Sequence, residues 1–280
     1  MTKVMMMHKD YRSITPEGCF DRPADSKEAW SLDTKRARFI VKKKFRGLAG
    51  SRRLGQLWLA LDPLFLGLVY YFVFTVIRHK TDPVSVFIGI TYIRILQNAL
   101  KSGYSVMPDF TGGLKIERVR TRAVILSEYL IGLFNSFFMC LGIGIIFILI
   151  FNVGIVEAVL FWLLGLLTYY FWYALGNVLS PLSIIVPDTK PIVSYFGTLM
   201  LFGSPALYTL SETSGIHRTI NLYNPVSFCV EPARAAILGT TDYKLLSIEV
   251  AYVLLLILSI LVIINILRFD KIRWRFSTWS

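Results

Sequence analysis

Long apolar runs separated by short polar connections dominate the pattern of this chain. The runs cover residues 56–77, 83–106, 124–153, 155–179, 192–210 and 248–267. A helix needs roughly 20 mostly apolar residues to cross about 30 Å of hydrocarbon, and each of these runs is near or above that length. The pattern therefore predicts an all-α integral membrane protein with six transmembrane helices.

The amphipathic pattern before the first run predicts a different kind of helix. Lysines and arginines recur from Lys35 to Arg53 with no acid among them, and an apolar stripe follows Ala37, Val41, Phe45 and Leu48. Spacings of four, four and three place this stripe on one face of a helix. We expect an interfacial helix over residues 34–53 whose lysines reach anionic lipid headgroups. A solvated charge run is the alternative.

The polar ends of the chain are expected to be cytosolic tails. Residues 1–33 mix charges of both signs and lack the apolar core of a secretory signal, so we expect a flexible tail there. Residues 271–280 form the second tail, and residues 54–270 form the transmembrane domain between them.

Composition and charge support this organisation. Of 280 residues, 55% are hydrophobic, and the net charge of +12 comes from 30 Lys and Arg against 18 Asp and Glu. Such a charge on a soluble protein would suggest nucleic acid, but here the cations cluster beside apolar runs. Basic clusters precede the first run, separate the second from the third, and follow the sixth. Because cytoplasmic loops carry excess Lys and Arg, both termini are predicted to be cytosolic, in the cytoplasmic (inner) membrane. We expect no nucleic-acid partner.

The link between the fifth and sixth runs has an unusual composition. Residues 211–244 are too many for a turn and too apolar for a simple exposed loop. Pro225 and Pro232 are expected to break the link into short helices. Apolar runs of ten to fourteen residues at membrane depth are typical of re-entrant segments, so we predict a re-entrant helical hairpin over residues 214–240 in the outer leaflet.

Polar residues inside the second run form one helix face. Arg94, Gln97, Asn98 and Lys101 recur at spacings of three, four and seven. One central Arg costs about 2.5–3.5 kcal/mol in hydrocarbon, so two cations facing lipid are disfavoured. In one interpretation the face lines an aqueous route or a subunit interface that attracts phosphate. In the other, Arg94 pairs with Glu128 or Glu157 while Lys101 extends to the cytosolic surface.

The fourth run contains a block of aromatic residues. Tyr169, Tyr170, Trp172 and Tyr173 offer flat rings for sugars or apolar ligands, together with phenols that form hydrogen bonds. Helix packing and an interfacial aromatic belt are the alternative interpretation.

Residues for chemistry are scarce. The sequence contains neither an HExxH motif nor a phosphate-binding Walker loop, and its three cysteines and three histidines are scattered. We therefore expect no catalytic residue, no metal site and no bound cofactor. ATP-driven transport would require hydrolysis on a separate chain.

Segments in this order resemble the permease subunits of type-2 ABC exporters, especially those that export capsular polysaccharide, O-antigen or teichoic acid. The resemblance spans residues 35–270 and is carried by residues 45–64, 110–122, 202–208 and 224–239, which include Phe202-Gly203-Ser204-Pro205 and Asn224-Pro225-Val226-Ser227-Phe228. Departures occur at Pro187-Asp188, where the family often has Arg-Asp, and at Glu117-Arg118-Val119-Arg120.

The resemblance implies an assembly. Two copies would form a homodimer that moves a lipid-linked glycan, with ATP-Mg bound by two separate ABC ATPase subunits. The ATPases would dock at a coupling segment containing Leu114, Lys115, Arg118 and Arg120. The substrate path would be lined by Arg94, Gln97, Asn98, Lys101, Tyr169, Tyr170, Trp172 and Tyr173. An external gate would contain Asn224, Pro225, Glu231 and Arg234.

Three other functions are left open. A small lipid or drug as cargo would keep the same fold. A multi-span lipid-modifying enzyme would need a reactive group at a membrane face, and a non-transporting scaffold subunit would need no ATPase.

Overall fold

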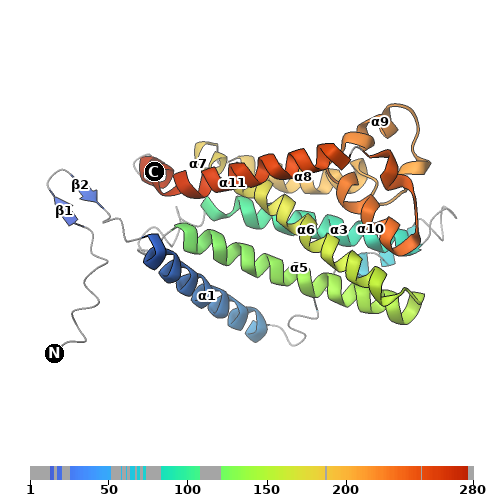
Figure 1. Cartoon of the computed structure of the whole chain (residues 1–280), viewed down its shortest axis with the longest axis horizontal. Helices are drawn as coiled ribbons and strands as arrows, with labels where there is room; N and C mark the ends of the chain where they lie inside the picture. Colours follow the sequence, from blue (N-terminus) through green and yellow to red (C-terminus); the bar gives the residue numbers. More distant parts are fainter. Residues whose placement is uncertain are drawn as a thin grey trace.

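The fold is an elongated bundle of helices, seen in a computed structural model (Figure 1). The structure describes residues 13–15, 18–20, 26–51, 58, 61, 64–66, 68–69, 72–73, 83–107, 121–186, 188–246 and 248–276. The long helices are α1 (Ser26–Ser51), α3 (Pro83–Tyr104), α5 (Thr121–Phe151), α6 (Ile155–Leu179), α8 (Thr189–Gly203) and α11 (Ile248–Phe276). The prediction of an all-α protein is confirmed; β1 (Ser13–Thr15) and β2 (Gly18–Phe20) form one short antiparallel pair.

The apolar runs coincide with helices along most of their length. Three described helices are long and apolar enough to cross a membrane: Arg122–Phe151, Ile155–Leu179 and Glu249–Leu267. The second predicted span forms α3, whereas α8 has only 15 residues. Most of the first predicted span, residues 56–77, lies outside the described residues. Six membrane crossings therefore stay a prediction.

Local sequence explains where several helices begin and end. Pro83 opens α3, a position where the missing N–H costs no helical hydrogen bond. Asn152 follows α5 with a φ of 53°, a left-handed conformation that asparagine tolerates, and the chain reverses into α6. Ser204 and Pro205 follow α8, which therefore ends earlier than the predicted span at residue 210.

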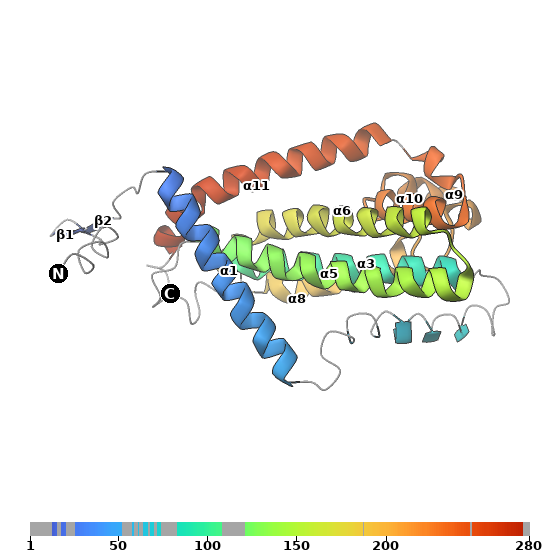
Figure 2. The ribbon, with the colours of Figure 1, turned by 60° about the horizontal axis from the view of Figure 1, so that its bottom comes forward.

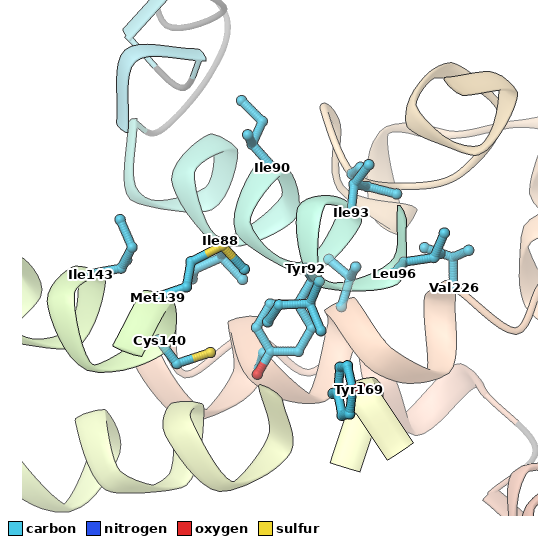
Figure 3. Packing of buried hydrophobic residues seen from close by; sticks show 14 of the residues in the cluster. Ile88, Ile90, Tyr92, Ile93, Leu96, Met139, Cys140, Ile143, Tyr169 and Val226 are labelled. Carbon is cyan, nitrogen blue, oxygen red and sulfur yellow. The ribbon is translucent and has the colours of Figure 1, made fainter. Parts of the chain in front are cut away.

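The core lies between α3, α5 and α6 (Figure 3). Ile88, Tyr92 and Leu96 of α3 are buried in the cluster that also contains Cys140 of α5. Glycines allow α3 and α6 to approach closely: a Cβ at Gly103 would lie 2.7 Å from the Asn177 backbone nitrogen. Small residues at helix contacts are the usual solution in membranes, where lipid supplies no hydrophobic driving force between helices.

Helix α1 crosses the bundle at a steep angle and packs on α5 (Figure 2). Phe45 meets Phe134 of α5 at a ring distance of 4.4 Å, and Lys44 forms an ion pair with Glu128. Phe45, one residue of the predicted apolar stripe, thus packs on α5. The helix begins at Ser26 rather than near residue 34, so part of the predicted tail is helical.

The bundle has two distinct ends. Helix α1 and the last turns of α11 lie at one end, called here the α1 end, and the short helices α9 (Gly215–Tyr223) and α10 (Ser227–Leu238) lie at the other (Figures 1 and 2). We call residues 204–246 at that end the hairpin. Pro225 separates α9 from α10 as predicted. The prediction that Pro232 breaks the segment is wrong, because Pro232 lies inside α10. Its missing N–H removes one helical bond, and the buried neighbours Val230 and Ala233 hold the helix.

Candidate functional site

The polar face of α3 lies beside α8. Gln97 donates from Nε2 to the Gly197 carbonyl at 3.1 Å, and Arg94 donates from Nη1 to Gln97 Oε1 at 3.4 Å. Asn98 and Lys101 are exposed. Tyr104, one turn further along α3, shares a hydrogen bond with Thr189 at the start of α8. The structure thus places the four predicted path residues of α3 on one helix face, and Gln97 also joins α3 to α8.

The carboxylates proposed as alternative partners of Arg94 have other neighbours. Glu128 lies against Lys44 of α1, and Glu157 occupies the first turn of α6 beside Gly154. The exposure of Lys101 fits both interpretations of the face, since a long side chain reaches water from a helix end.

The aromatic block of α6 ties helices together. Tyr169 and Tyr173 are buried and donate to carbonyls of α5, at Tyr129 (3.2 Å) and Ile125 (2.7 Å). Tyr170 shares a hydrogen bond of 2.9 Å with Ser259 of α11. Trp172 is buried in the core. A single copy of the chain uses these rings for packing and their phenols for bonds between helices, and their assignment to a substrate path stays a prediction.

The predicted gate residues Glu231 and Arg234 form a fully buried ion pair. Arg234 Nη1 lies 2.8 Å from Glu231 Oε1, and both side chains are 0% exposed. Arg234 also donates to the carbonyls of Pro205 (2.5 Å) and Ala206 (2.9 Å). Burial raises the pKa of Glu231, an effect that the charge of Arg234 opposes, and burial likewise lowers the pKa of Arg234. The pair thus fastens α10 to the turn that follows α8.

The same turn packs on α3. A Cβ at Gly89 would lie 2.8 Å from Ala206 Cα, so only glycine fits at this contact. Two sequence-separated motifs, the Ser-Pro turn and the Glu231–Arg234 helix, therefore meet on α3. The sequence showed both motifs, but it did not predict that the Ser-Pro turn and the Glu231–Arg234 helix contact each other.

A hydrogen-bonded network that sequence reasoning missed covers the hairpin. Tyr208 shares a hydrogen bond of 2.9 Å with His217 Nε2, and Asn221 donates from Nδ2 to the Tyr208 hydroxyl at 3.3 Å. Asn224 donates to Asn221 Oδ1 at 3.3 Å and accepts from the Val226 N–H at 3.0 Å. Asn224, a predicted gate residue, thus belongs to this network, and the predicted gate residue Pro225 follows it directly in the chain. Sequence reasoning assigned no chemistry to His217, because its partner Tyr208 lies outside α9 and only the fold brings the two side chains together.

Comparison with known proteins decides the family. The sequence profile described as "ABC-2 type transporter" matches residues 36–238. The chain belongs to the ABC-2 type transporter family. Two proteins from Klebsiella pneumoniae, each described as "O-antigen export system permease protein RfbA", are 26% identical over 247 residues, covering 85% of this chain and 92% of the relatives. This permease is a transport subunit, and ATP hydrolysis belongs to a separate subunit in the family.

The predicted coupling residues of this permease, Leu114, Lys115, Arg118 and Arg120, lie outside the described residues. Their neighbours on both sides are described: α3 ends at Tyr104 and α5 begins at Thr121, both at the α1 end (Figure 1). Ser180 joins α3 to α6 at that end, because its hydroxyl donates to the Tyr104 carbonyl (3.0 Å) and accepts from the Met107 N–H (2.9 Å).

Proposed function

We propose that this permease exports a lipid-linked polysaccharide of the capsule, O-antigen or teichoic acid type across the cytoplasmic membrane. The observation that supports the cargo most strongly is the likeness, over 85% of the chain, to permeases named for O-antigen export. In this proposal two copies form a homodimer, each served by an ABC ATPase subunit that binds ATP-Mg, and both termini are cytosolic.

The two ends of the bundle fit the two sides of this assembly. The α1 end carries the exposed cations Lys35, Arg38, Lys42 and Lys43, which suit a cytosolic surface next to anionic lipid. Residues 114–120 would contact the ATPase there. The hairpin end would face outward, and the Glu231–Arg234 pair would hold α10 as one rigid part of an external gate.

The cationic face of α3 supplies the chemistry for a phosphate-bearing lipid carrier. Arg94 and Lys101 lie on that face, with Lys101 exposed and closer to the α1 end. Charge-assisted hydrogen bonds to phosphate are about twice as strong as neutral ones. We infer that Lys101 meets the carrier first and Arg94 meets it deeper in the membrane.

Gene deletion tests the cargo. Cells without this chain should lose their surface glycan and accumulate the polymer inside, and the intact gene should restore export. An unchanged surface glycan, with altered export of a small lipid or drug instead, would favour the alternative cargo and overturn this one.

Charge reversal tests the coupling segment. The double variant Lys115→Glu and Arg118→Glu should abolish export and substrate-stimulated ATP hydrolysis while membrane insertion stays normal. Normal export by that variant would refute docking at this segment. The conservative variant Lys115→Arg with Arg118→Lys is the matched control and should retain most export.

A further inference from the structure

An open depression lies on the hairpin beside the Tyr208–His217 pair. Its volume is about 500 Å³, and its lining consists of Tyr208, Glu212, Thr213 and His217. The lining combines the Tyr208 phenol ring and the His217 imidazole with a carboxylate and a threonine hydroxyl. Specific small-molecule sites combine ring surfaces with a few convergent polar groups in this way.

Hydrogen bonds to neighbouring groups hold the side chains of the lining in place. The Tyr208 and His217 rings lie 5.1 Å apart and share a hydrogen bond, and both are within reach of the fully buried Asn221 amide. Thr213 is 7% exposed and donates to the Leu210 carbonyl at 2.6 Å. Glu212 accepts from the Thr209 N–H at 3.3 Å. Side chains fixed in advance lose little entropy when a ligand binds.

Charge narrows the ligand class. Glu212 lines the depression, and the Asp242 carboxylate accepts from the N–H of the neighbouring Ser211 at 3.0 Å. Among the residues that the structure describes, neither lysine nor arginine lines the depression. Two carboxylates disfavour phosphate and acidic sugars, whereas a carboxylate, an imidazole and a hydroxyl all form hydrogen bonds with sugar hydroxyls.

We propose that this depression is a binding site for an uncharged sugar unit, used by the glycan at the hairpin end of the permease. The aromatic rings would receive the apolar face of the sugar, and Glu212, Thr213 and His217 would bond its hydroxyls. The placement on the export route rests on the proposed function. It adds a second recognition site, distinct in charge from the cationic face of α3.

Saturation-transfer NMR on the full chain in lipid nanodiscs tests the site. The probes are methyl α-D-mannopyranoside and methyl β-D-glucopyranoside, with methyl β-D-glucuronide as the anionic counterpart. At least one uncharged glycoside should receive saturation and the glucuronide should not. Tyr208→Leu and His217→Ala should each weaken binding about tenfold, because each removes a ring and a hydrogen-bonding group. Arg218→Ala, on the same helix but outside the lining, should bind as the parent does.

A charge-neutral variant separates recognition from misfolding. Glu212→Gln keeps the acceptor for the Thr209 N–H, so the segment should keep its structure. This variant should gain binding of the glucuronide, because it removes the carboxylate that repels an anionic sugar. Absence of saturation transfer to both uncharged probes would overturn the site. So would equal binding by the parent, Tyr208→Leu and His217→Ala.

The outcome is distinguishable from failure of the proposed function. If gene deletion removes the surface glycan but the uncharged probes do not bind, the sugar site alone is refuted. If the probes bind and deletion leaves the glycan unchanged, the export function is refuted while the site stands.

Discussion

Arginine and lysine side chains occur in two contrasting settings in this permease. In the hairpin, Arg234 is fully buried, and its guanidinium binds one carboxylate and two backbone carbonyls. On α3, Lys101 is exposed, and Arg94 is half-buried beside Gln97. The Arg234 guanidinium thus uses its hydrogen bonds inside the protein, whereas the Lys101 ammonium reaches solvent.

This contrast separates Arg234, a structural cation, from Lys101, an exposed cation that a ligand can reach. A buried charge costs several kcal/mol in desolvation, roughly, and is tolerated only with excellent partners. Arg234 has such partners, so its role is to position α10. The exposed Lys101 ammonium has no such desolvation cost to offset within the fold, and it can exchange a bound water for a phosphate oxygen.

The largest stability effect is expected for Glu231→Ala. The substitution leaves the Arg234 charge buried beside two carbonyls only, and breaking a buried pair in this way costs about 3–5 kcal/mol. The melting temperature of the purified protein and its yield in membranes should both fall sharply. An unchanged melting temperature would contradict the positioning role of the pair.

A smaller loss is expected for Gly89→Ala. The added Cβ would collide with the backbone of Ala206, where Arg234 fastens the turn, and overpacking costs about 1–3 kcal/mol. Gly144→Ala is the matched control, because a Cβ at Gly144 meets nothing within 4 Å. Thermal melting of the two variants measures the difference; equal melting temperatures would show that the turn can shift away from α3.

A third variant tests a neutral polar group, the buried Tyr173 hydroxyl, whose hydrogen bond joins two helices. Tyr173→Phe removes the hydrogen bond to the Ile125 carbonyl and should destabilise the protein by about 0.5–1.5 kcal/mol. Tyr252→Phe, on the exposed face of α11, should leave the melting temperature unchanged. A loss of export without loss of stability in Tyr173→Phe would instead support a place for Tyr173 in the substrate path.

The smallest stability effect is expected for Lys101→Met, within about 0.5 kcal/mol, because the side chain is exposed. Export should nevertheless fall about tenfold, since a charge-assisted bond to phosphate is lost. Lys101→Arg keeps the charge and should retain export. Surface glycan and melting temperature measured together decide the matter; normal export by Lys101→Met would remove Lys101 from the substrate path.

The apolar runs predicted the long helices well and the hairpin contacts poorly. The run at residues 155–179 coincides with α6, and the run at 83–106 nearly matches α3, because a helix in hydrocarbon must satisfy its backbone locally. The end of α8 was placed too late, since Ser204 and Pro205 continue the apolar pattern while turning the chain. Pro232 was expected to break a helix that tertiary packing preserves.

The candidate site also has one part that the sequence predicted and one part that only the fold revealed. Spacing alone placed Arg94, Gln97, Asn98 and Lys101 on one face, because helical periodicity is local. In the network around His217, His217 and Asn221 share α9, but Tyr208 lies outside that helix, so its contacts with them depended on the fold of the hairpin.

The sequence by itself determined the membrane setting, the helical class and the polar face of α3. Each follows from local chemistry: hydrocarbon selects apolar runs, and a helix repeats its faces every few residues. The tertiary structure alone decided that Arg234 binds the turn after α8, that α1 packs on α5, and that Tyr208 meets His217. These contacts join separate segments of the chain. The pattern of apolar and polar residues does not encode their distance in space, because short connections and close glycine contacts between helices set that distance.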